Sequence, residues 1–171
     1  MDRKGNVASA FYHPLFFSEN SIVERSELKE VKQVIQSTIF AYDMGVQSEE
    51  PWKKQSDYMP TMFQVWREQK DFIADLYKKR EATYALDPMR HAIANFISAL
   101  FWTNGVNVPR LTHLEEDLNK LTYKPINVYE RLAFVMKKPF LYHSFIQLGE
   151  LYQELERLYA KMLIVQKKQP H

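Results

Sequence analysis

The stretch PFLYHSFIQLGELYQELERLYAKMLIV, residues 139–165, decides the fold class of this 171-residue chain. Its apolar residues recur at alternating steps of four and three, the spacing of one helix face. A second apolar stripe runs beside the first, so the helix needs more than one neighbour, which favours a bundle over a two-stranded coiled coil. Gly149 costs about 1 kcal/mol relative to alanine inside a helix and predicts a close helix crossing. The first stripe comprises Leu141, Phe145, Leu148, Tyr152, Leu155, Tyr159 and Met162, and the second Leu151, Leu158 and Val165.

The first half of the chain predicts two further helices. Ser21 and Glu24 have the spacing of a capping box, in which a hydroxyl and a carboxylate bind free amides at a helix start. The apolar residues that follow, beginning at Leu28, recur at steps of three and four, and Gly45 is placed to end this helix. After a polar connection, Pro60 predicts the first turn of the second helix, where its missing amide costs nothing.

The second half predicts three helices and then the long one opened by Pro139. A cap residue followed by proline, Asp87-Pro88, opens the first of them, and Gly105 ends it. Residues 112–115 have capping-box spacing before a short helix, and Asn127 caps another. No strand-like alternation competes with these predictions.

These segments predict an all-α fold with a single domain. Residues 21–171 are expected to form a bundle of about five to six helices with a long C-terminal helix. A chain of 171 residues, 46% of them hydrophobic, is large enough to bury a core without disulfides or metals. Residues 1–20 lack a clear period and are expected to form an N-terminal arm that packs through Phe11, Tyr12, Leu15, Phe16 and Phe17.

Composition excludes several classes of function. The chain has no cysteine, which excludes disulfides, thiolate metal sites and cysteine nucleophiles. Its 23 Lys and Arg against 21 Asp and Glu give a net charge of +2, too small for a strong field that attracts nucleic acid or anionic membrane. No apolar run approaches the roughly 20 residues that span a bilayer, and the N-terminus does not match a signal peptide. We therefore expect a cytoplasmic protein without membrane association.

A polar seam interrupts the apolar stretch RHAIANFISALFWTNG, residues 90–105. At 100° per residue, His91, Asn95, Ser98 and Trp102 fall within about 60° of one helix face. One interpretation is that this seam is the solvent-exposed edge of an amphipathic central helix. The other is a candidate groove between neighbouring helices, which would make these four residues the first site to examine.

Catalytic and metal motifs are not apparent. The four glycines stand too far apart for a phosphate-binding loop, and no nucleophile motif occurs. His113 and Asp117 share a helix face that could hold two metal ligands, but a helix N-terminus explains the acidic residues equally well. We therefore expect a non-enzymatic protein with no catalytic residue, no cofactor and no metal ligand. A small metal-binding helical protein stays as an alternative.

Two features point to macromolecular partners. Trp52 lies in the polar connection and is a candidate anchor for a protein partner, although it could also fold back onto the bundle. Four Lys-Lys pairs could gather into a patch for nucleic acid or nucleotide, but lysines at helix C-termini also complement the helix dipole. We expect contacts with a protein partner or with a second copy in a homodimer, with nucleic-acid binding as the alternative. The pairs are residues 53–54, 78–79, 137–138 and 167–168.

KKPFLYHSFIQLGELYQELERLYAKM, residues 137–162, and NFISALFWTNG, residues 95–105, resemble the YpoC-like family of small helical proteins from Firmicutes. The resemblance implies a cytoplasmic bacterial protein that is helical throughout. It brings no activity and no catalytic residue to any position of this chain.

Overall fold

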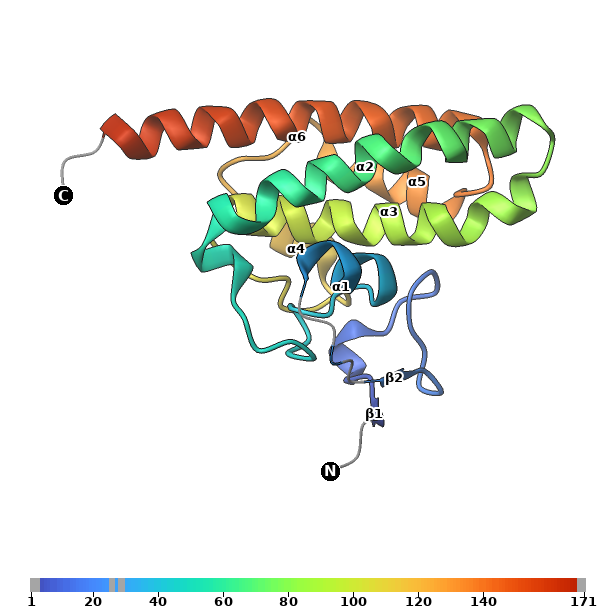
Figure 1. Ribbon diagram of the computed structural model, residues 1–171, viewed down its shortest axis with the longest axis horizontal. Coiled ribbons are helices and arrows are strands. Elements are labelled where there is room, and N and C mark those ends of the chain that lie inside the picture. The colour runs from blue at the N-terminus through green and yellow to red at the C-terminus, as the bar shows by residue number, and fades with distance from the viewer. Residues whose placement is uncertain (1–3, 25–26, 28–29, 169–171) are drawn as a thin grey trace.

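The computed structural model describes residues 4–24, 27 and 30–168. Among these residues, six α-helices and a two-stranded antiparallel ribbon form one molecule in which α2, α3 and α6 run side by side along the long axis (Figure 1). The elements are β1 (Lys4–Asn6), η1 (Ser9–Phe11), β2 (Ile22–Glu24), α1 (Val31–Ser37), η2 (Pro51–Lys53), α2 (Gln55–Lys78), α3 (Ala82–Thr103), α4 (Leu114–Asn119), α5 (Val128–Lys137) and α6 (Tyr142–Lys168). The predicted all-α fold with a long C-terminal helix is confirmed.

Helix α3 is the centre of the core. Every residue from Ala92 to Thr103 is buried, because α2, α6 and the segments after α1 and α3 surround this helix. On the α2–α6 side, the rings of Trp66 and Tyr152 stack in parallel at 4.5 Å. The hydroxyl of Tyr152 donates a hydrogen bond of 2.5 Å to the Ala92 carbonyl, which ties α6 to α3.

The capping box at Ser21 is wrong. Residues 22–24 form β2, which pairs with β1, and the Ser21 hydroxyl instead accepts a hydrogen bond from the Ser18 amide. Leu28, the first apolar residue of the predicted stripe, lies outside the described residues. Helix α1 ends well before Gly45, because the chain turns at Phe40, which has a φ of 55°. This turn buries every side chain from 39 to 42, which a helix with one apolar face would not do.

Two predicted proline starts are wrong. Pro60 and Pro88 lie inside α2 and α3, which begin earlier, at Gln55 and Ala82. Each proline removes only the one hydrogen bond that its amide would make to the carbonyl four residues earlier, and the packing of both helices offsets that loss. At the other end of α3, Gly105 has a φ of +76° and ends the helix as predicted.

The remaining predicted helices are present, and α5 begins directly after Asn127 and ends at Lys137, as predicted. The capping box predicted at residues 112–115 is wrong: α4 begins at Leu114, so His113 and not Thr112 is at its N-cap. Neither His113 nor Asn127 makes a side-chain capping bond. The last helix begins at Tyr142 and not at Pro139, whose carbonyl accepts a hydrogen bond of 2.5 Å from the Tyr77 hydroxyl. Among the described residues, no helix combines the length and apolar composition needed to cross a membrane.

Candidate functional site

The polar seam of α3 divides into two environments. Its first half, His91 and Asn95, lines a cavity of about 290 Å³ between α1, α2 and α3. Its second half, Ser98 and Trp102, is buried against the connection that follows α1. The seam therefore does not form one continuous groove, and only His91 reaches solvent.

Apolar and amide side chains share the walls of the cavity. The stacked pair of Trp66 and Tyr152 contributes aromatic surface from α2 and α6. No Lys or Arg is among the lining residues. The apolar lining residues are Ile35, Val65, Trp66, Pro88, Ala92 and Tyr152, and the polar ones are Gln36, Gln69, Asp87, His91 and Asn95.

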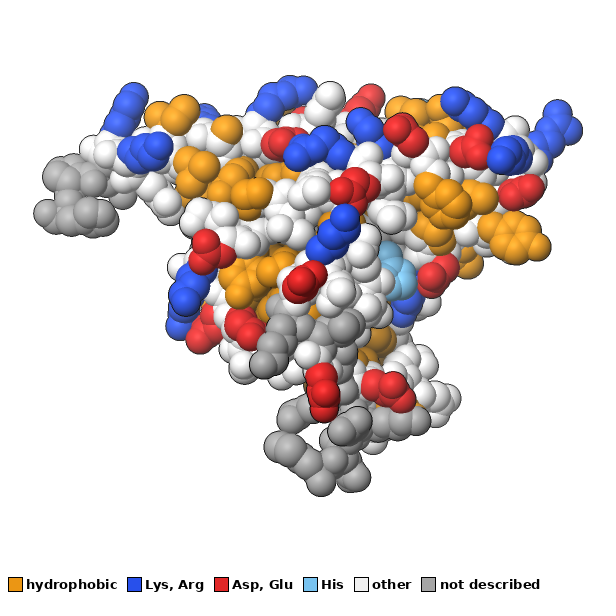
Figure 2. Space-filling view, in the orientation of Figure 1, with side chains coloured by type: hydrophobic (Ala, Val, Ile, Leu, Met, Phe, Trp, Pro, Cys, Tyr) orange, Lys and Arg blue, Asp and Glu red, His pale blue; other side chains and the backbone are white. Residues whose placement is uncertain are grey.

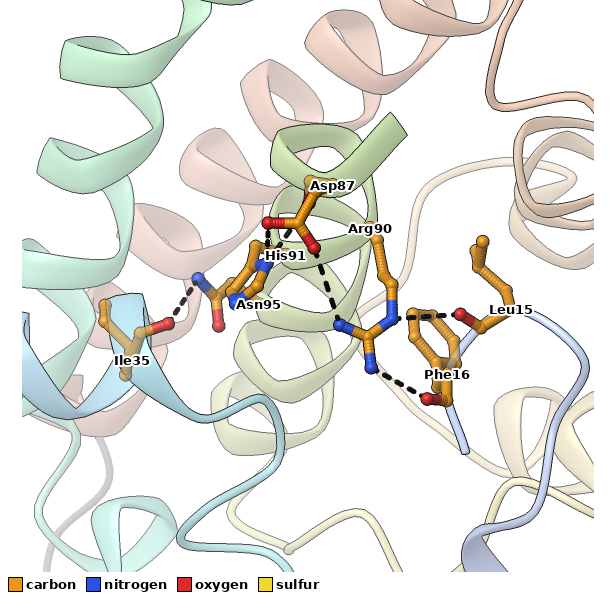
Figure 3. Close-up of polar contacts among 7 residues, drawn as sticks. All are labelled: Leu15, Phe16, Ile35, Asp87, Arg90, His91 and Asn95. Carbon is orange, nitrogen blue, oxygen red and sulfur yellow. Dashed lines mark hydrogen bonds and ion pairs between the residues drawn. The ribbon is translucent and has the colours of Figure 1, made fainter. Parts of the chain in front are cut away.

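Hydrogen bonds fix the polar side chains at the mouth of the cavity (Figure 3). Nδ1 of His91 lies 3.1 Å from the backbone carbonyl of Asp87. Because a carbonyl only accepts, His91 donates from Nδ1, and Nε2 is left for another partner. Asn95 donates from Nδ2 to the carbonyl of Ile35 at 3.3 Å, which joins α3 to α1.

Arg90 points to the other side of α3 and binds the N-terminal segment. Its Nε and Nη2 donate to the carbonyls of Leu15 and Phe16 at 3.0 and 2.7 Å (Figure 3). The guanidinium also lies 5.9 Å from the ring centre of Phe17. Two carbonyls in an irregular segment leave no local sequence pattern, so the sequence did not indicate this role.

Asp43 is the buried acceptor for the second half of the seam. Its Oδ2 accepts a hydrogen bond from Ser98 Oγ at 2.7 Å, and its Oδ1 accepts from Trp102 Nε1 at 2.8 Å and from the Val108 amide at 2.9 Å. Burial raises the pKa of this carboxyl, and the hydrogen bonds oppose that shift. Asp43 lies in the apolar run IFAYDMG, residues 39–45, and this is the sequence feature that could have indicated its burial. The arrangement joins three segments and leaves no room for a ligand role.

A second surface lies at the end of the bundle where α2 turns into α3 and α5 turns into α6. Seven of the eleven exposed large hydrophobic side chains of the described chain belong to residues 72–86 and 134–146, which flank these two turns. Figure 2 shows hydrophobic side chains beside Lys and Arg at the right-hand end of the molecule. We call this surface the basic–aromatic end; it comprises Phe72, Tyr84, Leu86, Phe134, Phe140, Tyr142 and Ile146 with Lys78, Lys79, Arg80, Lys137 and Lys138.

The four lysine pairs do not form one patch. Lys78 and Lys138 belong to the same end, because Tyr77 and Pro139 beside them are hydrogen-bonded. Residues 53–54 lie at the opposite end of α2, a helix of 24 residues and therefore about 36 Å long. The fourth pair ends α6, and Lys53 and Gln166 line one surface depression. The pairs thus gather two and two at opposite ends of the bundle.

The other candidate residues have structural surroundings. Trp52 is half-buried and packs against the core. Asp117 receives two hydrogen bonds from Arg110, at 3.0 and 3.2 Å, while His113 contacts Thr112. The described residues contain no group of three His, Cys, Asp or Glu side chains placed to hold a metal ion.

Comparison with known proteins identifies the family. Residues 56–167 match the family model described as YpoC-like protein. The chain is 31% identical over 134 residues to a Bacillus subtilis (strain 168) protein described as uncharacterized protein YpoC, with 77% of this chain and 82% of that protein covered. No solved structure matches the chain. The matched region runs from the start of α2 almost to the end of α6 and so covers five of the six α-helices, and the chain belongs to the YpoC-like family.

Proposed function

We propose that the protein acts without catalysis, by binding another protein through the basic–aromatic end. The observation that carries this proposal is the concentration of exposed hydrophobic side chains around two neighbouring turns. Tyr84 is 71% exposed, Phe72 54% and Phe140 53%. Apolar side chains gathered at one place on a surface are typical of interaction sites, and aromatic residues contribute strongly to binding energy.

The charge of this end indicates the chemistry of the partner. Five Lys and Arg residues stand at the ends of α2 and α5 beside the acidic Asp75 and Glu81. Within the described part of the chain, only Lys79 among the five forms an ion pair, with Asp75 at 2.8 Å. The C-termini of α2 and α5 lie beside the N-termini of α3 and α6, so the opposite helix dipoles largely cancel at this end. The dipoles therefore do not neutralise the Lys and Arg side chains. A partner surface with apolar pockets and an acidic rim would complement both features.

The same charge disfavours a second copy of this chain as the partner. In a two-fold dimer an interface patch contacts itself, so the lysines of one copy would face those of the other. We therefore expect a monomer of 20.4 kDa when light scattering is measured on the purified protein at high concentration. A dimer that Lys78→Glu or Lys138→Glu disrupts would overturn the choice of a different protein as partner.

Affinity capture from the native host tests the proposal. The wild-type protein is compared with a double variant that combines Tyr84→Ala and Phe140→Ala. The single variants Ile126→Ala and Ile164→Ala are the matched controls. Ile126 is 80% and Ile164 54% exposed, but both lie away from this end. We expect the wild type and the controls to retain one protein, and the double variant to retain at least tenfold less of it. We also expect the contact surface of that retained protein to be acidic. The proposal is wrong if the double variant retains the same proteins as the wild type.

Nucleic-acid binding is a weaker candidate. Only two of the four lysine pairs, residues 78–79 and 137–138, lie at the basic–aromatic end, and exposed aromatic side chains surround them there. If the captured partner were nucleic acid, binding would fall steeply with salt and would respond to Lys78→Glu more than to Phe140→Ala.

A further inference from the structure

We propose that the cavity between α1, α2 and α3 binds a neutral, planar nitrogen heterocycle of the size of a nucleobase or nucleoside. The cavity does not include the residues of the basic–aromatic end, so the proposal is independent of the proposed protein contact. Its volume of about 290 Å³ is close to the lower end of small-molecule sites, roughly 300–1,000 Å³. Its walls combine apolar surface with a few polar groups, as in such sites.

Unused hydrogen-bonding groups converge on this cavity. Asn95 is only 6% exposed and donates to Ile35, but its Oδ1 accepts no hydrogen bond from the described chain. The amides of Gln36 and Gln69 and Nε2 of His91 also have no hydrogen-bond partner among the described residues. No buried side-chain N or O atom of the described residues lacks a hydrogen-bond partner, so Oδ1 is open to the cavity, where a ligand N–H would replace water as its donor.

The charge of the lining residues decides against an anionic ligand. No Lys or Arg lines the cavity; the nearest one along α3, Arg90, binds the carbonyls of Leu15 and Phe16, and its Nη1 lies 3.9 Å from the carboxylate of Asp87 at the rim (Figure 3). The single carboxylate, Asp87, lies at the rim with 78% of its side chain exposed. A phosphate or carboxylate would find no counter-charge here, and a neutral ligand avoids that desolvation cost.

The amide and aromatic groups specify the shape of the ligand. A carboxamide offers one acceptor and one donor side by side, which pair with adjacent acceptor and donor atoms on the edge of a heterocycle, as Asn and Gln do with adenine. Trp66 and Tyr152 stack on each other and are only 7% and 3% exposed, so they form the apolar wall beside which such a ring would lie. Three carboxamides and one imidazole beside an aromatic pair therefore point to a nucleobase or nucleoside without its phosphate.

Calorimetric titration with adenine, adenosine, uridine and AMP tests this proposal on the full chain. We expect adenine, adenosine or uridine to bind, and AMP to bind at least tenfold more weakly than adenosine. Gln69→Leu and Gln36→Leu keep the side-chain size but remove the amide, and each should weaken binding at least tenfold. Gln153→Leu, an exposed glutamine of α6, is the matched control and should bind as the wild type does.

Circular dichroism verifies that each variant is folded, and Ala92→Met provides a second test by filling the cavity. We expect Ala92→Met to abolish binding while Tyr84→Ala with Phe140→Ala leaves it unchanged. The proposal is overturned if no base or nucleoside binds at millimolar concentration, if AMP binds more tightly than adenosine, or if Gln69→Leu and Gln36→Leu bind as the wild type does.

Discussion

Trp102 donates a hydrogen bond of 2.8 Å from its indole Nε1 to Oδ1 of Asp43, and so joins the buried centre of α3 to the connection after α1. The same carboxylate accepts hydrogen bonds from Ser98 and from the amide of Val108. One buried side chain therefore holds three segments that are far apart in the sequence. It satisfies polar groups that would otherwise lie unpaired inside the core.

Asp43→Ala should strongly destabilise the protein. The substitution leaves an indole N–H, a hydroxyl and a backbone amide without their buried acceptor. We expect the free energy of unfolding to fall by about 3–5 kcal/mol, measured by urea denaturation at pH 7. Asp43→Asn keeps an acceptor oxygen and should lose much less. Equal losses for the two variants would show that the hydrogen bonds are not the stabilising feature.

The charge of Asp43 should make stability depend on pH. Burial raises the pKa of this carboxyl above 3.8, so the folded state holds the proton more tightly than the unfolded state. The contribution of Asp43 to stability therefore falls as pH rises from about 3.8 through the raised pKa. Asp43→Asn lacks this contribution, so its stability relative to the wild type should increase with pH over that interval. Urea denaturation at several pH values between 4 and 8 measures the difference, which would be constant if the folded pKa were not raised.

Arg90→Lys should loosen the N-terminal segment. A lysine cannot reproduce the fork that binds the carbonyls of Leu15 and Phe16. We expect a loss of about 1–2 kcal/mol and faster hydrogen exchange at the amides of residues 13–17, measured by mass spectrometry. Arg157→Lys, at an exposed position of α6, is the control and should leave this exchange unchanged. Unaltered protection in Arg90→Lys would contradict the anchoring role.

Arg80→Gly should stabilise the protein. Arg80 has a φ of 58° at the turn after α2, where the Glu81 amide binds the Leu76 carbonyl. The left-handed conformation costs a residue with a side chain about 1 kcal/mol and costs glycine almost nothing. We expect the melting temperature to rise by about 1–4 °C. Lys78→Gly, inside α2, should lower it, and a decrease in both variants would mean that the turn is not strained.

Gly149→Ala should also stabilise the protein. A Cβ atom at this position would lie 3.6 Å from Cζ2 of Trp66, an ordinary contact distance. The gain in helix propensity, about 1 kcal/mol, is therefore expected in the free energy of unfolding from urea denaturation. Gly149→Leu should destabilise instead, because the larger side chain would displace Trp66 from its stack on Tyr152. A loss of stability with alanine would mean that the crossing is already too close for a methyl group.

Helices with a long apolar repeat were predicted well from the sequence. Helix starts that were predicted from local capping residues or prolines were predicted less well. The first stripe of α6 and the end of α3 at Gly105 agree with the sequence, because they depend on a long apolar repeat and on a left-handed turn. Of the second stripe only Leu151 is buried, and Leu158 and Val165 are partly exposed. The signals at Ser21 and Pro60 failed, because a cap or a proline contributes only about 1–3 kcal/mol and packing of the whole segment exceeds that. Of the candidate groove, the sequence supplied His91 and Asn95, but not the glutamines of α1 and α2 that complete the cavity.

The sequence alone determined that this chain is a helical bundle with a long C-terminal helix, because apolar residues at helical spacing must be buried against other helices. Only the tertiary structure decided what the polar residues of α3 do. His91 and Asn95 face a cavity, Ser98 and Trp102 bind Asp43, and Arg90 binds the N-terminal segment. These partners lie far apart in the sequence, and hydrogen bonds between distant segments form only where packing brings them together.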